Sequence, residues 1–422
     1  MKHYLLPATL AVSCLSLVGA VQPAHSQEVG PTSATVASFN ILHQFSNPTD
    51  GGGPTGRLVR DSAGNLYGAS GGGPDNYGVV FKLSPRGQYT VLHSFNGTDG
   101  SFPEAGLVRD ADGNLYGTTS EGGSAGDGIV FKLTPAGVFT VLHNFHGAPD
   151  GAVPMADLLL DGSTLYGTTS EGGKGCSNPY GASGCGTVFK VTTAGAETVV
   201  YRFANSPDGA HPAAGLVMDS DGNFYGTTAA GGNVFEGTPL GTVFRVTATG
   251  EETVLYRFNG INDGDGQDPR STLIWGENGG LYGTTVEGGP NGWGTVFRLT
   301  RTGAESILYS FPRSSDDGES PEAGVVRESA ANLYGTTLIG GAENTGCSGD
   351  GCGAVFKLTP NNAESVLHSF TDSGTGGCAP DTALLAVASG QTEILYGSTP
   401  FCGARGNGTI FEIQLNQAST VK

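Results

Sequence analysis

The chain has 422 residues, of which 72 are glycine, and only 14% of them are charged. Its 39 acidic residues outnumber the 20 basic ones, for a net charge of −19. This acidic balance argues against a nucleic-acid-binding protein, which needs a basic surface. The 37% of hydrophobic residues is too high for a disordered chain, and the glycines lack the collagen period.

The N-terminus carries the features of a secretory signal. Lys2 precedes an apolar run that ends at Ala24-His25-Ser26, so we expect cleavage after residue 26. A membrane anchor is the alternative, but the run contains Pro7 and is short for a span. Cys14 leaves a lipoprotein option. We therefore expect a signal peptide at 1–26, a linker at 27–38, no transmembrane segment, and secretion to the periplasm or the cell exterior.

The rest of the chain repeats one unit seven times. A Leu-Tyr-Gly or Phe-Tyr-Gly signature places its tyrosine at Tyr67, Tyr116, Tyr166, Tyr225, Tyr282, Tyr334 and Tyr396. A Val-Phe or Ile-Phe pair and then a segment such as 91–95 follow each signature. Each unit holds four short runs rich in β-branched and aromatic residues, for example 106–109, which are typical of strands. We find no sustained helical periodicity and expect essentially no helix.

Four strands in each unit of about 50 residues predict an all-β fold, a seven-bladed β-propeller with four antiparallel strands per blade. Residues 39–45 match a fourth strand that no blade precedes, and residues 409–413 match a third strand that no fourth follows. We expect the N-terminal strand to complete the last blade, because closure removes free strand edges. One propeller domain then spans 39–415, followed by a tail at 416–422.

The repeat strongly resembles a known family. The ordered signatures Asp-x-x-Gly-Asn-Leu-Tyr-Gly-Thr-Thr, Gly-Thr-Val-Phe-Lys-Leu and Val-Leu-His-Ser-Phe are similar to the GloVer tandem-repeat family of secreted bacterial proteins, the "choice-of-anchor" group, over residues 39–413. The resemblance implies a repeat fold and export, and it implies no known chemistry. The WD, kelch and sialidase signatures of other propellers do not match.

The loop pattern indicates which face carries function. With the strands of a blade named A to D, the A–B and C–D turns are short and uniform, whereas the B–C and D–A loops are long and differ between blades. Asp110 and Asp219 in A–B turns look like calcium ligands, but tight turns explain them better. Variable loops on a rigid scaffold usually bind ligands. Four aromatic residues in B–C loops could stack on sugar rings: Tyr77, Tyr180, Phe235 and Trp293.

Each D–A loop ends in proline before the innermost strand. We expect the residues directly after these prolines to ring the central opening: Thr55, Glu104, Met155, Ala213, Arg270, Glu322 and Asp381. Two positions further on, Arg57 and Asp157 join them. Core packing does not explain such diversity, so Glu104, Asp157, Glu322 and Asp381 are catalytic candidates and Arg57 and Arg270 are ligand-binding candidates. A solvated, self-neutralising rim is the alternative.

Histidine occurs in two settings. His43, His93, His143 and His368 share a strand-D position with Tyr201, Tyr256 and Tyr309, which indicates a structural, half-buried ring. His146 and His211 lie in D–A loops instead and are acid–base candidates.

Six cysteines follow the signal, an even number that predicts disulfides in a secreted protein. The repeat frame favours Cys176–Cys185, Cys347–Cys352 and Cys378–Cys402, and a cysteine metal site is the alternative. Separately, Asp263, Asp265 and Asp268 form an acidic loop that could wrap a calcium ion, the one cofactor we consider, or could be a solvated turn.

Three functions fit this sequence. The first is an extracellular binding module or scaffold for glycan or protein ligands, which we expect to be a monomer. The second is a carbohydrate-active enzyme: a glycoside hydrolase would use two carboxylates at the channel mouth, and a lyase is less favoured because an acidic protein repels a polyanion. The third is a structural surface or matrix protein.

Overall fold

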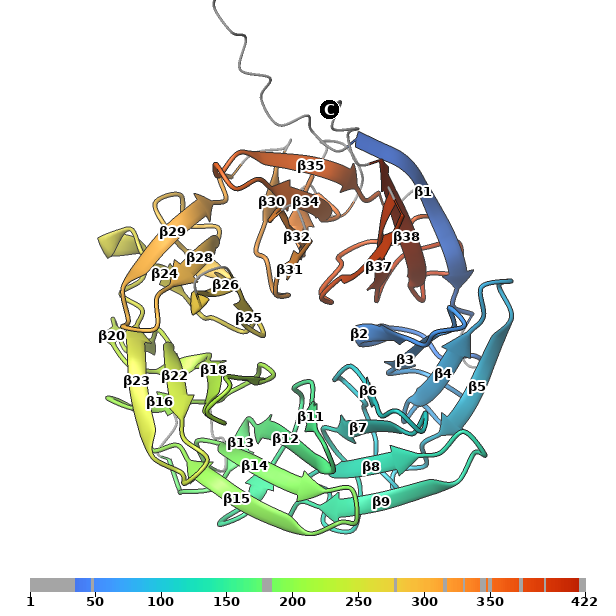
Figure 1. Cartoon of the computed structure of the whole chain (residues 1–422), viewed down its shortest axis with the longest axis horizontal. Helices are drawn as coiled ribbons and strands as arrows, with labels where there is room; N and C mark the ends of the chain where they lie inside the picture. The colour runs from blue at the N-terminus through green and yellow to red at the C-terminus, as the bar shows by residue number, and fades with distance from the viewer. Residues whose placement is uncertain are drawn as a thin grey trace, which may run out of the picture.

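The computed structural model describes residues 35–416, except 47–48, 177–183, 277–278, 314–316, 329–330, 342–346, 348–350, 372–374 and 391. Seven four-stranded antiparallel sheets stand around a central opening, which confirms the predicted seven-bladed β-propeller (Figure 1). Within these residues there is no α-helix, and none of the helical segments is long and apolar enough to cross a membrane. The predicted signal peptide and most of the linker and tail lie outside the described residues.

Each blade is numbered here in chain order, with its strands given from the channel outward. Blade 1 holds β2 (Pro54–Arg60), β3 (Leu66–Ser70), β4 (Val79–Leu83) and β5 (Tyr89–Ser94). Blade 2 holds β6 (Val108–Arg109), β7 (Leu115–Thr119), β8 (Ile129–Leu133) and β9 (Phe139–Asn144). Blade 3 holds β11 (Leu159–Asp161), β12 (Thr164–Thr169), β14 (Thr187–Thr192) and β15 (Glu197–Arg202).

The remaining blades follow the same order. Blade 4 holds β17 (Val217–Met218), β18 (Phe224–Thr228), β22 (Thr242–Val246) and β23 (Glu252–Arg257). Blade 5 holds β25 (Ile274–Trp275), β26 (Leu281–Thr285), β28 (Thr295–Leu299) and β29 (Glu305–Ser310). Blade 6 holds β31 (Val326–Arg327), β32 (Leu333–Thr337), β34 (Ala354–Leu358) and β35 (Glu364–Ser369). Blade 7 holds β36 (Leu385–Ser389), β37 (Thr392–Thr399), β38 (Thr409–Asn416) and β1 (Thr35–Gln44).

The N-terminal strand closes the ring. β1 pairs antiparallel with β38, from Phe39 opposite Ile413 to Gln44 opposite Thr409. In Figure 1 the blue β1 lies beside the red β37 and β38 on the outside of the last blade. Phe45 and Ile410 are fully buried at this junction. The predicted closure is therefore confirmed, and it pairs the edge that blade 7 would otherwise expose.

A glycine in the second strand of each blade makes room for the phenylalanine of the third. A Cβ atom on Gly117 would lie 2.7 Å from Cζ of Phe131 and 2.9 Å from Cδ2 of Leu107. Phe131 is fully buried. The same close approach recurs at Gly68, Gly167, Gly226, Gly283, Gly335 and Gly397. The Leu-Tyr-Gly and Val-Phe signatures thus recur together because they pack against each other.

The A–B turns are held by an aspartate. Asp110 accepts hydrogen bonds from the backbone N–H of Asn114 at 2.8 Å, from its side-chain amide at 2.7 Å, and from the Tyr116 hydroxyl at 3.0 Å. Asp61 and Asp219 are bound in the same way. Burial opposes ionisation of Asp219, but the hydrogen bonds outweigh it and lower the pKa of this carboxyl to about 2. These carboxylates are turn groups, as the sequence indicates.

The innermost strand of blade 2 is shorter than the sequence predicts. The sequence predicts a strand over 106–109, whereas β6 has two residues. The reason is crowding at the axis, where a Cβ on Gly106 would lie 2.8 Å from the backbone nitrogen and oxygen of Arg57 in blade 1. The Gly106 N–H donates to Asp157 Oδ1 in blade 3 at 2.6 Å. Gly106 therefore contacts the neighbouring blades at the axis instead of extending the strand of its own sheet.

Candidate functional site

The long D–A and B–C loops lie on one face and are hydrogen-bonded to each other. Four blades form this contact as a small two-stranded ladder: β10 (Gly151–Ala152) with β13 (Glu171–Gly172), β16 (Gly209–Ala210) with β19 (Ala230–Gly231), β24 (Gly266–Gln267) with β27 (Glu287–Gly288), and β30 (Gly318–Glu319) with β33 (Ile339–Gly340). We call the surface formed by these loops the loop face. The ladders make it a rigid platform.

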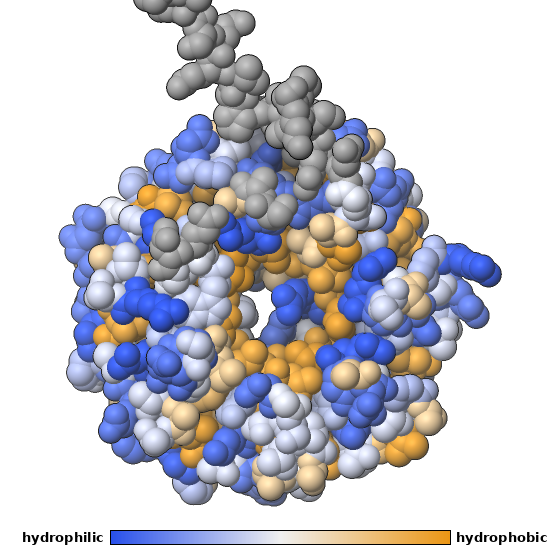
Figure 2. Space-filling model, in the orientation of Figure 1, coloured by the Kyte–Doolittle hydropathy of each residue, from blue (hydrophilic) through white to orange (hydrophobic). Residues whose placement is uncertain are grey.

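A cavity of about 460 Å³ occupies the mouth of the central channel. We call the prolines that end the D–A loops the ring prolines. The lining of the cavity includes every residue that follows a ring proline: Thr55, Glu104, Met155, Ala213, Arg270, Glu322 and Asp381. Arg57 and Asp157 line it as well. The structure thus brings together the residues that the proline spacing places around the opening, which is visible at the centre of Figure 2.

Apolar and charged residues both line the mouth. Met155 and Ala213 come from the adjacent blades 3 and 4, and Arg270, Glu322 and Asp381 come from the consecutive blades 5, 6 and 7. Charged groups also come from blades 1 to 3, namely Arg57, Glu104 and Asp157. Figure 2 accordingly shows both hydrophobic and hydrophilic colours around the opening. A ligand in this cavity meets nonpolar surface and charged groups together.

Burial shifts the pKa values of three acidic groups at the mouth. It raises the pKa of Glu104 and of Glu322, the latter against the opposing charge of Arg270. For Asp381, burial and then the nearby charge of Glu322 raise the pKa to about 7. Asp381 Oδ1 is buried and has no hydrogen-bond partner among the described residues. Asp157 Oδ1 accepts a hydrogen bond from the Gly106 N–H at 2.6 Å.

Arg270 belongs to two cavities at once. It lines the channel mouth and also a second cavity of about 430 Å³ between loops of blades 3 to 5, which Glu171, His211 and Glu287 line too. Asp268 holds its guanidinium: Arg270 Nε lies 2.9 and 3.0 Å from the two carboxylate oxygens, and a terminal nitrogen lies 2.9 Å from Oδ2. This fixed geometry presents one cation to both cavities.

The residue before each ring proline has a left-handed backbone conformation. The seven residues have φ between 54° and 60° and are Gly53, Phe102, Val153, His211, Asp268, Ser320 and Ala379. The His211 N–H donates to the Cys185 carbonyl of the preceding blade at 3.0 Å, and the His211 carbonyl accepts from the Ala229 N–H at 3.1 Å. The position thus ties the B–C loops of adjacent blades. The left-handed conformation costs a non-glycine residue about 1 kcal/mol, yet six of these seven positions hold a side chain.

The aromatic candidates are placed differently from one another. Tyr77 and Phe235 are 41% and 40% exposed, whereas Trp293 packs against a buried cluster of blades 5 and 6. Tyr180 lies outside the described residues. Sequence reasoning missed Phe102, which is 38% exposed and whose N–H donates to the Tyr77 carbonyl at 2.9 Å. Its place before a ring proline is the signal that could have identified it.

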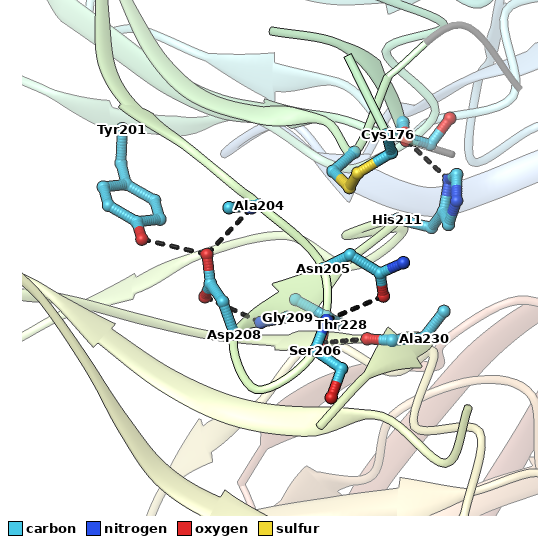
Figure 3. Close-up of a disulfide and its surroundings, with 12 residues drawn as sticks. Cys176, Tyr201, Ala204, Asn205, Ser206, Asp208, Gly209, His211, Thr228 and Ala230 are labelled. Carbon is cyan, nitrogen blue, oxygen red and sulfur yellow. Dashed lines mark hydrogen bonds between the residues drawn. A yellow bond between two sulfur atoms is a disulfide. The ribbon is translucent and has the colours of Figure 1, made fainter. Parts of the chain in front are cut away.

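The histidines also separate by position. His211 lines the second cavity, and its Nδ1 lies 2.9 Å from the Ser170 carbonyl oxygen (Figure 3). His146 is 60% exposed and lies 3.8 Å from Asp150, away from both cavities. In the outer strands, His43, His93 and His143 contact an aspartate of the following D–A loop through Nε2, and Tyr201, Tyr256 and Tyr309 contact the equivalent aspartate through their hydroxyls. The structural role explains why these two residue types exchange.

Three disulfides brace the loop face, and they are the three pairs that the sequence predicts: Cys176–Cys185, Cys347–Cys352 and Cys378–Cys402. The first lies in a B–C loop close to His211 (Figure 3). The sulfurs of Cys347, Cys378 and Cys402 lie within 4.8 Å of one another, so the other two disulfides are neighbours. Cys378 precedes Asp381 by three residues and anchors the loop that presents it.

The acidic loop has other partners than a metal. Asp263 ends the short 3-10 helix η1 (Ile261–Asp263). Asp265 is buried and accepts hydrogen bonds from the Tyr256 hydroxyl and from the Asn259 N–H at 2.7 and 2.8 Å. Asp268 is paired with Arg270. Within the described residues these three carboxylates form no common cluster, and the calcium site stays a prediction.

The repeat identified from the sequence matches a family model. The Gloeobacter/Verrucomicrobia repeat matches residues 31–178, 175–349 and 268–422. The chain belongs to this repeat family. The seven blades are therefore the form that a Gloeobacter/Verrucomicrobia repeat array takes in this protein. None of the curated proteins compared with the chain matches it.

This repeat protein is similar to several solved structures at low identity. A candidate 6-phosphogluconolactonase from Bacteroides fragilis is 15% identical, with 81% of this chain and 86% of that chain covered and a TM-score of 0.48. An α-L-arabinanase from Penicillium chrysogenum, complexed with arabinobiose, is 11% identical, with 91% and 99% covered and a TM-score of 0.45. A gluconolactonase from Xanthomonas campestris is 12% identical, with 92% and 98% covered and a TM-score of 0.41.

Proposed function

We propose that this protein binds a saccharide on its loop face, at the mouth of the channel, outside the cytoplasm. The observation that carries the proposal is the position of Arg270, which lines two cavities and is fixed by Asp268. A fixed guanidinium can donate hydrogen bonds to the hydroxyl groups of a ligand, and the buried carboxyl groups nearby can accept hydrogen bonds from them. Three disulfides support export, because such bonds persist in oxidising compartments.

The mixed lining of the mouth favours a sugar over a purely polar or purely apolar ligand. Sugar rings have apolar faces and polar edges, which match a cavity lined by Met155 and Ala213 as well as by charged groups such as Arg270, Glu322 and Asp381. Tyr77 and Phe102 are exposed aromatic residues of the loop face, and the Phe102 N–H donates to the Tyr77 carbonyl. The net charge of −19 disfavours polyanions, so we propose neutral oligosaccharides as the ligand class.

A glycan array probed with the mature protein, followed by calorimetric titration of the selected saccharide, tests this proposal. Arg270→Ala is expected to weaken binding at least about tenfold, the loss of one charged hydrogen-bonding group. Arg301→Ala is the matched control, because Arg301 lies in a C–D turn and donates to the Gly279 carbonyl of an A–B turn on the opposite face. Absence of any glycan signal, or capture of protein ligands alone, would overturn the saccharide assignment.

A glycoside hydrolase is the second candidate, and one observation favours it. Asp381 has a pKa of about 7 beside Glu322, so one carboxyl can hold a proton while its neighbour is ionised. Product analysis on neutral polysaccharides between pH 5 and 7 tests this activity. Asp381→Asn should abolish product formation and leave saccharide affinity within a few-fold. If the wild-type protein binds a glycan and releases no product from it, the protein is a binding module.

A further inference from the structure

Contacts between the outer strands of successive blades follow a rule. Within the described residues, at six of the seven junctions an aspartate of the D–A loop contacts the His or Tyr of one outer strand, and a residue of the next outer strand lies beside this ring. Where the ring is His43, His93 or His368, the next blade supplies an aromatic residue that stacks on it, namely Tyr89, Phe139 or Phe39. Where the ring is Tyr201, Tyr256 or Tyr309, the next outer strand begins with Glu252, Glu305 or Glu364.

The junction between blades 2 and 3 breaks this rule, because His143 there meets Glu197 rather than an aromatic residue. His143 Nε2 lies 3.1 Å from Asp150 Oδ2, and the ligand atoms of His143, Asp150 and Glu197 all lie within 4.8 Å of one another. Among the described residues, the other cluster of this kind consists of disulfide-bonded cysteines.

Glu197 Oε1 is buried and has no hydrogen-bond partner among the described residues, and the same is true of Oε1 in Glu252, Glu305 and Glu364, so this atom does not by itself distinguish the junction. A second imidazole does distinguish it. His146 follows His143 by three residues. Its Nδ1 atom lies 3.8 Å from Asp150 Oδ2, the oxygen that His143 contacts. His146 is 60% exposed, and its side chain can turn toward the cluster. Three ligand groups therefore lie within 4.8 Å of one another, and the His146 imidazole lies at their edge.

We propose that His143, Asp150 and Glu197, with His146 as the fourth ligand, bind a divalent zinc ion that bridges blades 2 and 3. Tetrahedral zinc with bonds of 2.0 to 2.1 Å places neighbouring ligand atoms about 3.3 Å apart. The 3.1 Å between His143 Nε2 and Asp150 Oδ2 is compatible with this spacing, although the His93–Asp99 pair has the same distance, so the approach of Glu197 to this pair is what sets the site apart. Imidazole ligands select zinc and similar transition metals over calcium and magnesium.

The nearby charges allow this site. Arg202, on the same outer strand as Glu197, is held by the Pro149 carbonyl through Nε at 2.7 Å and acts on Glu197 together with His143. Arg257 makes the same contact with the Pro207 carbonyl at the junction of Tyr201 and Glu252, at 2.9 Å. That junction, shown in part in Figure 3, is a natural comparison, because it differs from the proposed site in having Tyr201 for His143 and Ala204 for His146.

The test uses the mature chain without an affinity tag, stripped with a chelator and titrated with zinc sulfate by calorimetry. Cobalt absorption reports the geometry, and calcium chloride serves as the control ion. We expect one zinc equivalent, a tetrahedral cobalt spectrum, a thermal midpoint raised by zinc, and no response to calcium. No zinc binding, or a spectrum of six-coordinate cobalt, would overturn the proposal.

Two variants remove ligands while copying junctions that this chain already forms. His143→Tyr reproduces the Tyr201 junction, and Glu197→Phe reproduces the His93–Phe139 junction. Each should remain folded and lose zinc affinity at least about 100-fold. His93→Tyr is the control and should bind zinc like the wild type. If His143→Tyr and Glu197→Phe both keep wild-type affinity, the ion binds elsewhere and the assignment is wrong.

A gain-of-function variant tests the same geometry independently. The double substitution Tyr201→His and Ala204→His places the same ligand set around Asp208 and Glu252. This variant should bind two equivalents of zinc instead of one. A stoichiometry that stays at one in a folded double variant would contradict the proposed ligand set.

Discussion

Phe39 lies flat on His368, with ring centroids 3.7 Å apart and an interplanar angle of 10°. Phe39 belongs to β1, the outer strand of blade 7, and His368 belongs to β35, the outer strand of blade 6. The N-terminal strand therefore completes its own blade and also locks that blade to its neighbour. Burial at this junction lowers the pKa of His368 to about 4.

Replacement of Phe39 by Ala should weaken ring closure. We expect the free energy of unfolding to fall by about 2–3 kcal/mol, because a half-buried ring and its stacking contact are lost. Deletion of residues 27–46 should lower the thermal midpoint further, since it exposes the edge of β38. Val36→Ala, at an exposed position of β1, is the control. Unchanged melting of the deletion variant would refute closure as a source of stability.

Gly117→Ala tests the packing that underlies the repeat. The added Cβ would lie 2.7 Å from Cζ of the buried Phe131, so either strand must shift. Overpacking of this kind costs about 1–3 kcal/mol, measurable by urea unfolding. Gly175→Ala is the matched control, because no atom lies within 4 Å of a Cβ there. Equal stability of the two variants would contradict the packing role.

Glu252 should make stability depend on pH. Burial and then the charge of Asp208 raise its pKa to about 7. Its contribution is fully present below the ordinary glutamate pKa and is lost as the pH rises through 7. After allowance for partial exposure, we expect wild-type stability to fall by about 1–2 kcal/mol more than that of Glu252→Gln between pH 4.5 and 8.

Glu251→Gln, at the exposed neighbouring position, is the control for this titration. Its unfolding free energy should follow the wild-type profile at every pH. Parallel profiles for the wild type and Glu252→Gln would show that the pKa of Glu252 is the same in the folded and unfolded chain.

Val153→Gly should relieve the strain before a ring proline. Val153 has φ of 56°, a conformation that glycine adopts freely. The relief of about 1 kcal/mol is partly offset by the entropy cost of an added glycine, so we expect stability to rise by about 0.5 kcal/mol. Ala152→Gly, one residue earlier in β10, should instead destabilise. A less stable Val153→Gly variant would show that the valine side chain contributes more than its backbone strain costs.

The fold could be predicted from the sequence because its signals are local and repeated. Tyr116 and Phe131 recur in every unit, and each marks a strand whose neighbours are adjacent in the chain. The ring at the mouth was also predictable, since a proline marks each entry to an inner strand. Glu104 and Asp381 could be placed at the mouth without knowing how the blades contact each other.

Contacts between blades were not predictable, because no local pattern gives the offset of one blade against the next. The sequence grouped Asp268 with Asp263 and Asp265, whereas the structure pairs it with Arg270. The approach of Glu197 to His143 spans 54 residues (197 − 143) and depends on the angle between two sheets. The left-handed φ of Phe102 likewise cannot be predicted from its residue type.

Hydrogen–deuterium exchange, measured with and without the saccharide that the array selects, tests the central claim most directly. The account predicts slower exchange in the segments around the mouth, namely 102–106, 268–272, 320–324 and 379–383. It predicts unchanged exchange in the A–B and C–D turns of the opposite face. Protection confined to those turns, or spread over the outer strands with the mouth unaffected, would contradict a binding site at the channel mouth.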